Sequence, residues 1–219
     1  MSKSYDATLA EKTAVIEEGN TGHVHKDPFG ARIGMWLFLM TELLLFGGMF
    51  LIYGAYRYMN TDAFHLAAHE LNTIIGTFNT VILLTSSLTV ALSITALQRG
   101  NRNLAVLLLA LTIIFAFWFL TNKYFEWSHE IHNGIYPGSA ILKNRSNGEI
   151  LFFGLYYVMT GVHGLHVIIG IVLLSFMLVF ILRGKITPEE SIKLEVAGLY
   201  WHLVDIIWIF LFPLFYLLR

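Results

Sequence analysis

Long apolar stretches separated by short polar ones dominate the chain after residue 30. A helix needs roughly 20 apolar residues to cross a hydrocarbon core of about 30 Å, and five stretches reach or approach that length. They cover residues 33–56, 72–97, 104–121, 150–182 and 196–218. None shows the short alternating pattern of barrel strands, and backbone groups in lipid must be bonded within their own segment. The pattern therefore predicts an all-α, polytopic bundle of five transmembrane helices.

The composition agrees with lipid as the main solvent. Hydrophobic residues make up 56% of the sequence and charged residues 13%, about half the charged share of a soluble domain. So few charges cannot cover a water-exposed surface. The net charge of −1 gives no sign of a nucleic-acid partner. Because the chain has no cysteine, disulfides, thiolate metal sites and iron–sulfur clusters are excluded.

Positive residues predict the orientation. Of the 14 Lys and Arg residues, nine fall on the N-terminal side of the predicted bundle and five on the other side. The positive-inside rule then places the N-terminus in the cytoplasm and the C-terminus outside. Residues 1–30 are polar and read as a cytoplasmic arm rather than a removable signal peptide. Residues 31–219 form the predicted transmembrane domain, in which 122–149 is expected to be the one sizeable external loop.

Five ionisable residues fall inside the predicted spans. Glu42 lies about ten residues, or roughly 15 Å, into the first span. His163 and His166 lie near the middle of the fourth span, and His202 and Asp205 near the middle of the fifth. Each of these two pairs has i,i+3 spacing and so shares one helix face. We expect the five groups to meet in the interior of the bundle.

Three interpretations of these groups stay open. The favoured one is a polar network whose hydrogen bonds fix helix packing. The second is proton handling, with Glu42 as the main candidate. The third is a metal site, for which histidine and carboxylate ligands suit zinc or iron, although the spans lack the Glu-x-x-His pairs of di-iron bundles. Outside the spans, His65 with His69, and Glu126 with His129 and His132, read as solvated loop residues. No catalytic or metal-binding residue is assigned.

Two motifs resemble the signatures of the heme–copper oxidase subunit III family. They are GVHGLHVIIG at residues 161–170 and YWHLVDIIWIFL at residues 200–211. The similarity extends to Thr41-Glu42, to FNTVILL at 78–84 and to FEW at 125–127, and it covers about residues 31–218 in order. The chain is similar to the shorter, five-helix bacterial form, which lacks the first two helices of the seven-helix form.

The resemblance implies a non-catalytic subunit of a proton-pumping terminal respiratory oxidase in the bacterial cytoplasmic (inner) membrane. Heme and copper then belong to partner subunits I and II, and this chain carries no cofactor beyond bound phospholipid. It would pack against subunit I, preserve the catalytic site during turnover and support proton uptake. Glu42 matches the buried carboxylate of the family's first shared helix. Association with a respiratory supercomplex is a further expectation.

Two rival functions remain at this stage. One is a subunit III-like partner of a quinol oxidase or a nitric oxide reductase. The other is a stand-alone proton-coupled transporter that uses Glu42 and Asp205. Transporters usually contain internal repeats, and no repeat is evident in this sequence.

Overall fold

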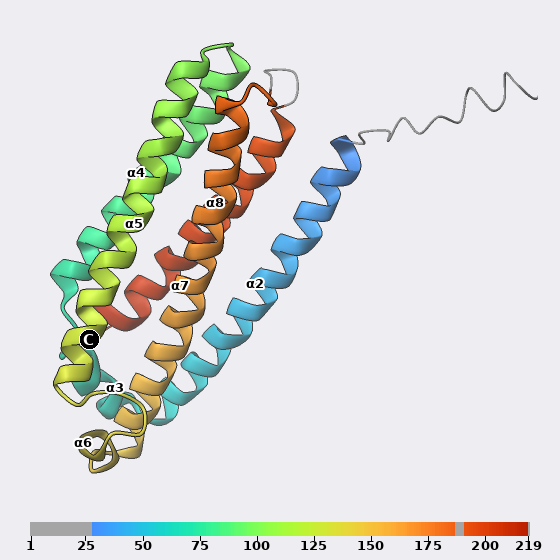
Figure 1. Ribbon diagram of the computed structural model, residues 1–219. Helices are drawn as coiled ribbons and strands as arrows, with labels where there is room; N and C mark the ends of the chain where they lie inside the picture. Colours follow the sequence, from blue (N-terminus) through green and yellow to red (C-terminus); the bar gives the residue numbers. More distant parts are fainter. Residues whose placement is uncertain (1–27, 187–190, 219) are drawn as a thin grey trace, which may run out of the picture.

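The computed structural model describes residues 28–186 and 191–218, which form a bundle of long helices (Figure 1). The elements are α2 (Pro28–Met59), α3 (Thr61–Ala68), α4 (Thr73–Gln98), α5 (Arg102–His132), α6 (Ala140–Lys143), α7 (Asn147–Leu182), α8 (Ile192–Phe212) and a π-helical turn (Pro213–Leu217). The described residues contain no strand. Five stretches are long and apolar enough to cross a membrane: Arg32–Met59, Thr73–Gln98, Arg102–His132, Asn147–Leu182 and Ile192–Leu217. The predicted fold class is confirmed, while the side that faces the cytoplasm stays a prediction.

Local polar residues and glycines set the helix ends. The Ser146 hydroxyl accepts a hydrogen bond from the Glu149 backbone N–H, and the Glu149 carboxylate accepts one from the Ser146 backbone, so a capping box starts α7. The Asn72 side chain accepts from the first backbone N–H groups of α4. After α4 and α7 the chain reverses at Gly100 and Gly184, whose φ angles are 77° and 68°. Glycine adopts this left-handed conformation without a steric cost.

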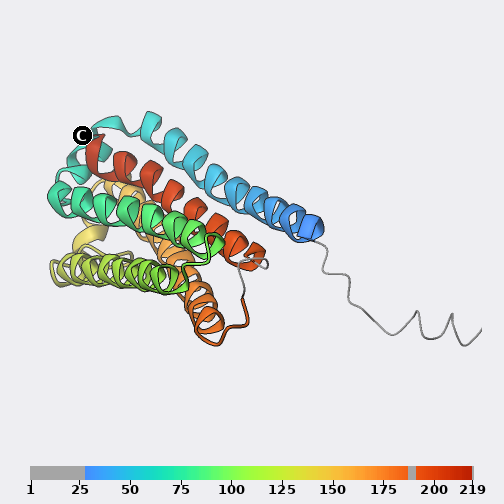
Figure 2. The same cartoon turned by 90° about the horizontal axis from the view of Figure 1, so that it is seen from above.

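The helices differ in how much of their surface the bundle covers. In the apolar stretch of the C-terminal span, 50% of the residues are buried, because α8 packs against α4, α7 and α2. α4 and α5 form a closely packed antiparallel hairpin. In α2 only 11% are buried, and this helix lies along the edge of the bundle in both views (blue in Figures 1 and 2). α2 is therefore the span most open to lipid or to another protein.

Aromatic side chains and small residues hold α8 against its neighbours. The indole N–H of Trp201 donates to the Ser86 hydroxyl of α4 at 3.1 Å, and that of Trp208 donates to Thr80 at 3.0 Å. On α7, a Cβ placed at Gly170 would lie 2.7 Å from two atoms of the Trp201 ring. Glycine at this position therefore lets α7 and α8 approach closely.

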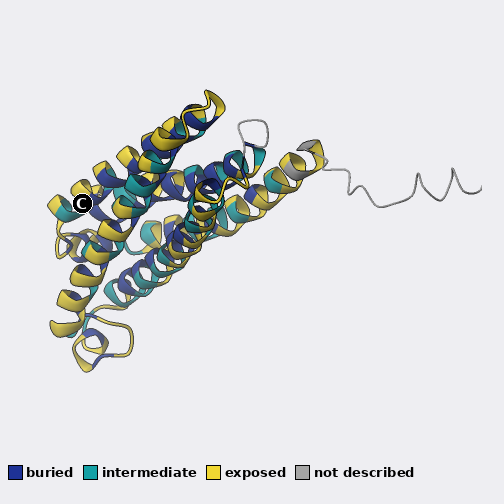
Figure 3. Ribbon diagram, turned by 45° about the horizontal axis from the view of Figure 1, so that its top comes forward, coloured by how far each residue is buried: buried dark blue, intermediate teal, exposed yellow. Residues whose placement is uncertain are grey.

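Exposed residues follow the outward faces of the helices (Figure 3). Large apolar side chains are common among them, including Trp36, Leu51, Ile74 and Phe176. Buried polar residues face the interior, including Asn79, Ser86, Thr112 and His163. An apolar outside around a partly polar inside is what a helix bundle in lipid requires.

Two segments predicted from the sequence differ from the structure or lie largely outside its described residues. The prediction of an external loop over residues 122–149 was wrong for its first part, because α5 continues to His132. Lys123, Glu126 and Glu130 end the apolar run in the sequence, yet all three are buried on the inner face of α5. Nearly all of the predicted arm, residues 1–27, lies outside the described residues, and α2 begins at Pro28.

Candidate functional site

Glu42 of α2 and His166 of α7 contact each other inside the bundle. The Nε2 atom of His166 lies 2.8 Å from a Glu42 carboxylate oxygen. The other ring nitrogen, Nδ1, lies 2.7 Å from the backbone carbonyl of Val162. A carbonyl oxygen only accepts hydrogen bonds, so Nδ1 carries its hydrogen. The contact between Nε2 and the carboxylate therefore holds one proton, bound either to Glu42 or to His166.

The surroundings of this pair exclude most solvent. The Glu42 and His166 side chains are 14% and 11% exposed. The ring of Phe46 contacts the His166 imidazole edge-on, with ring centroids 5.4 Å apart, and the Tyr200 hydroxyl donates to the His166 carbonyl at 3.2 Å. In such an environment the electrostatic attraction between the two groups is stronger than in water. The pair can hold a proton within the membrane-spanning region.

The other three sequence-predicted groups make no hydrogen bond with this pair. His163 is fully buried between the rings of Phe119 and Trp208, and neither of its ring nitrogens has a hydrogen-bond partner among the described residues. His202 Nδ1 lies 2.7 Å from the Ser87 hydroxyl. Asp205 is buried beside Ser87, and its carboxylate accepts no hydrogen bond within the described residues. Of the five groups that were expected to meet, only Glu42 and His166 bond to each other.

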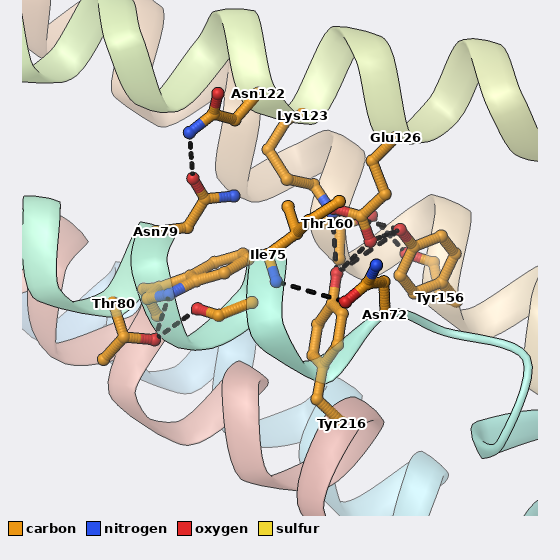
Figure 4. Close-up of polar contacts among 12 residues, drawn as sticks. Asn72, Ile75, Asn79, Thr80, Asn122, Lys123, Glu126, Tyr156, Thr160 and Tyr216 are labelled. Atoms are coloured by element: carbon orange, nitrogen blue, oxygen red, sulfur yellow. Dashed lines mark hydrogen bonds and ion pairs between the residues drawn. The ribbon is translucent and has the colours of Figure 1, made fainter.

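A second polar cluster, the Lys123 cluster, consists of Lys123, Glu126, Tyr156 and Tyr216 (Figure 4). The Lys123 ammonium donates to the Glu126 carboxylate at 3.1 Å and to the two tyrosine hydroxyls at 3.0 Å each. Both hydroxyls in turn donate to Glu126, that of Tyr156 at 2.7 Å. All three ammonium hydrogens have acceptors, and the two opposite charges lie side by side. The cluster joins α5, α7 and the C-terminal π-helical turn.

Sequence reasoning missed this cluster because it placed Lys123 and Glu126 in an external loop. One local signal was available, since the two residues have the i,i+3 spacing of a helical ion pair. Tyr216 was harder to predict, because it belongs to the π-helical turn Pro213–Leu217. The wider winding of this turn changes the direction of its side chains relative to an α-helix.

Polar residues at the end of the bundle near α3 and α6 are more exposed. Arg145 donates hydrogen bonds to Glu70 and Glu149 and so ties the end of α3 to the start of α7. The hydrogen bond with Glu70 raises the pKa of the Arg145 guanidinium, which keeps it charged. His65 and His69 have ring centroids 4.9 Å apart. Within the described part of the chain, no group of three or more His, Asp or Glu side chains is arranged to hold a metal.

Five apolar helices, an apolar outer surface and ionisable pairs in the interior define the chain as an integral membrane protein of the polytopic α-helical class. Residues 8–218 match the family model of cytochrome c oxidase subunit III. The chain belongs to this family and is a subunit III of a terminal respiratory oxidase. The resemblance noted in the sequence is confirmed.

The relatives include subunits named after different oxidases. The heme-copper oxidase subunit I+III of Aeropyrum pernix is 31% identical over an alignment of 214 residues, which covers 93% of this chain and 25% of that protein. A probable cytochrome c oxidase subunit 3 of Nocardia farcinica is 29% identical over 94% of this chain and 99% of its own length. The quinol oxidase subunit 3 of Bacillus subtilis is 29% identical over 85% of this chain and 86% of its own. The chain thus spans a quarter of the Aeropyrum protein and nearly all of the Nocardia one.

Proposed function

We propose that the chain stabilises the catalytic subunit I of a proton-pumping terminal oxidase and supports its proton uptake. The oxidase reduces oxygen to water in the bacterial cytoplasmic membrane. In this proposal the heme and copper centres belong to subunits I and II. The Glu42–His166 pair carries the argument, because it holds one proton between two helices in a medium where an unpaired ionisable group is costly.

The position of the pair suits uptake from the cytoplasmic side. Glu42 lies about ten residues after Arg32, where the span begins, so it is roughly 15 Å deep at helical rise. With the predicted orientation, Glu42 lies nearer the cytoplasmic end of the span, because 10 residues of Arg32–Met59 precede it and 17 follow it. A carboxylate and an imidazole that share a proton there can accept it from the cytoplasmic side and pass it on to a neighbouring subunit.

Subunit I is proposed as the main partner because the Aeropyrum relative is named as a subunit I+III protein. Two such subunits within one protein must lie near each other. Phospholipid is the second proposed partner. A cavity of about 470 Å³ between α5 and α7 has an almost wholly apolar lining that includes Gly161, Gly164 and Ile168, which suits an acyl chain. Membership of a respiratory supercomplex stays a prediction.

A quinol oxidase is the second candidate complex, favoured by the relatives of that name in Bacillus. Oxygen consumption by the purified complex with either reduced cytochrome c or a quinol as donor separates the two candidates. The transporter hypothesis has less support, since the two groups it needed are not bonded to each other: Glu42 contacts His166, and the Asp205 carboxylate has no hydrogen-bond partner within the described residues.

The test is purification of the tagged chain from native membranes in a mild detergent. The proposal predicts that subunits I and II co-purify in equal amounts, identified by mass spectrometry, together with heme absorbance. A lone homo-oligomer without a heme protein would overturn it.

A further inference from the structure

A continuous groove follows the seam between α2 and α8. Two cavities of about 240 and 230 Å³ share Leu43, Leu203 and Ile206 in their linings and so adjoin each other. Along α2 they extend from Trp36 to Phe50. At 1.5 Å per residue this distance is roughly 21 Å, or about two-thirds of a 30 Å hydrocarbon core.

One polar side chain interrupts the apolar lining of this groove. His202 of α8 lines it and bonds through Nδ1 to Ser87, on the inner side. Its Nε2 atom makes no hydrogen bond with any described residue. This atom is also not fully buried, so a partner outside the chain can reach it. A lipid tail cannot hydrogen-bond, so lipid alone would leave this nitrogen unsatisfied in the hydrocarbon region.

Two other apolar grooves have different polar groups in their linings. In the groove between α5 and α7, the Lys123 ammonium is fully engaged by its cluster, and the Thr160 hydroxyl donates to the Tyr156 carbonyl. A cavity of about 430 Å³ between α2 and the pair α7 and α8 is lined by Tyr200, whose hydroxyl donates to the carbonyl of His166. Tyr124 and Trp127 in the first groove and Lys193 in the second keep a polar group without a partner among the described residues. Tyrosine and tryptophan are typical of the membrane interface, and a lysine can extend its ammonium to that interface.

We propose that the α2–α8 groove is the seat of a transmembrane helix of oxidase subunit I, with His202 Nε2 bonded to a hydroxyl or amide side chain of that helix. The inference rests on the proposed function, which names subunit I as the partner. It adds the docking face and the polar anchor. Three observations support this docking face. α2 is the least covered span, and the groove is long enough for several helical turns. In addition, the unpaired Nε2 of His202 can form one of the side-chain hydrogen bonds that join helices in membranes.

Photo-crosslinking in native membranes tests the docking face directly. The chain has no cysteine, so Leu43→Cys and Ile206→Cys each give a single site for benzophenone maleimide in this subunit. Leu165→Cys and Ile168→Cys, in the α5–α7 groove, are the matched controls. We expect the α2–α8 positions to form adducts with subunit I and the control positions to form adducts with phospholipid.

The outcomes separate this inference from the proposed function. If subunit I co-purifies but the α2–α8 positions capture only lipid, or the control positions capture subunit I, the docking face is wrong while the function stands. If subunit I does not co-purify at all, both fail.

Substitutions at His202 test the anchor. We expect His202→Leu to retain roughly three- to tenfold less subunit I during detergent washes, the size expected for one intramembrane hydrogen bond, and His202→Gln to restore retention. Ser87→Ala, which removes the inner bond of His202 and the hydroxyl beside Asp205 but leaves Nε2 in place, should retain subunit I as the wild type does. Equal retention in His202→Leu and wild type, or equal losses in His202→Leu and Ser87→Ala, would contradict the anchor role.

Discussion

The Nε2 atom of His166 lies 2.8 Å from the Glu42 carboxylate and joins the outermost span to the bundle. The same imidazole is fixed from its other side by the Val162 carbonyl, which leaves one proton in the contact with Glu42. Nothing basic lies near Glu42 along its own helix, so its partner comes from a helix more than 100 residues later in the sequence, a separation of 124 positions.

Replacing the carboxylate separates its structural role from its proton. We expect Glu42→Gln to assemble and to keep its unfolding free energy within about 1 kcal/mol, because the amide can still donate to Nε2. Proton uptake by the complex should slow, because the amide does not titrate. Glu42→Leu should cost about 1–3 kcal/mol, since it leaves Nε2 unpaired. Thermal unfolding and pH-indicator measurements of proton uptake check both effects. Failure of Glu42→Gln to assemble would show that the carboxylate is structural.

In the Lys123 cluster, stability is expected to depend on whether the buried charges of Lys123 and Glu126 are paired. Lys123→Met leaves the Glu126 carboxylate buried beside two tyrosines without a cation, and we expect a loss of about 3–5 kcal/mol in stability. Lys123→Met combined with Glu126→Leu removes both charges and should cost clearly less than the single change. Thermal unfolding of the purified complex measures both variants. A double variant as unstable as the single one would contradict the assignment of a paired buried charge.

Two glycines on α7 form a matched pair for testing helix packing. An added Cβ at Gly170 would meet the Trp201 ring at 2.7 Å, whereas Gly164 has no atom within 4 Å of that position. We expect Gly170→Ala to destabilise by about 1–3 kcal/mol through overpacking. Gly164→Ala should be neutral or stabilise by up to about 1 kcal/mol, because alanine favours the helix. The melting temperatures of the two variants give the answer, and equal shifts would mean that α7 and α8 are not in close contact at Gly170.

The sequence was sufficient to predict the fold class and the five spans, because hydropathy over about 20 residues depends directly on whether a helix is surrounded by lipid or by water. It also selected Glu42 and His166 as residues whose burial needs a partner. It could not pair them, since helical periodicity shows which face of a helix is polar but not which helices are neighbours.

The Lys123 cluster shows the limit of hydropathy more clearly. Lys123 and Glu126 lower the local average and so appear to end the third span. In the structure they are buried, because Tyr156 from α7 and Tyr216 from the C-terminal turn supply their remaining hydrogen bonds. Whether a charge lies in a loop or in a core depends on such partners, and these are tertiary contacts.

Oxygen consumption during sustained turnover tests the central claim that this chain protects the catalytic subunit and supplies it with protons. The complex with and without this chain should begin at comparable rates per heme, after which the depleted complex should lose activity progressively while the intact complex remains steady. Re-addition of the purified chain before turnover should restore the steady rate. A depleted complex that holds a constant rate for as many turnovers as the intact one would contradict the account.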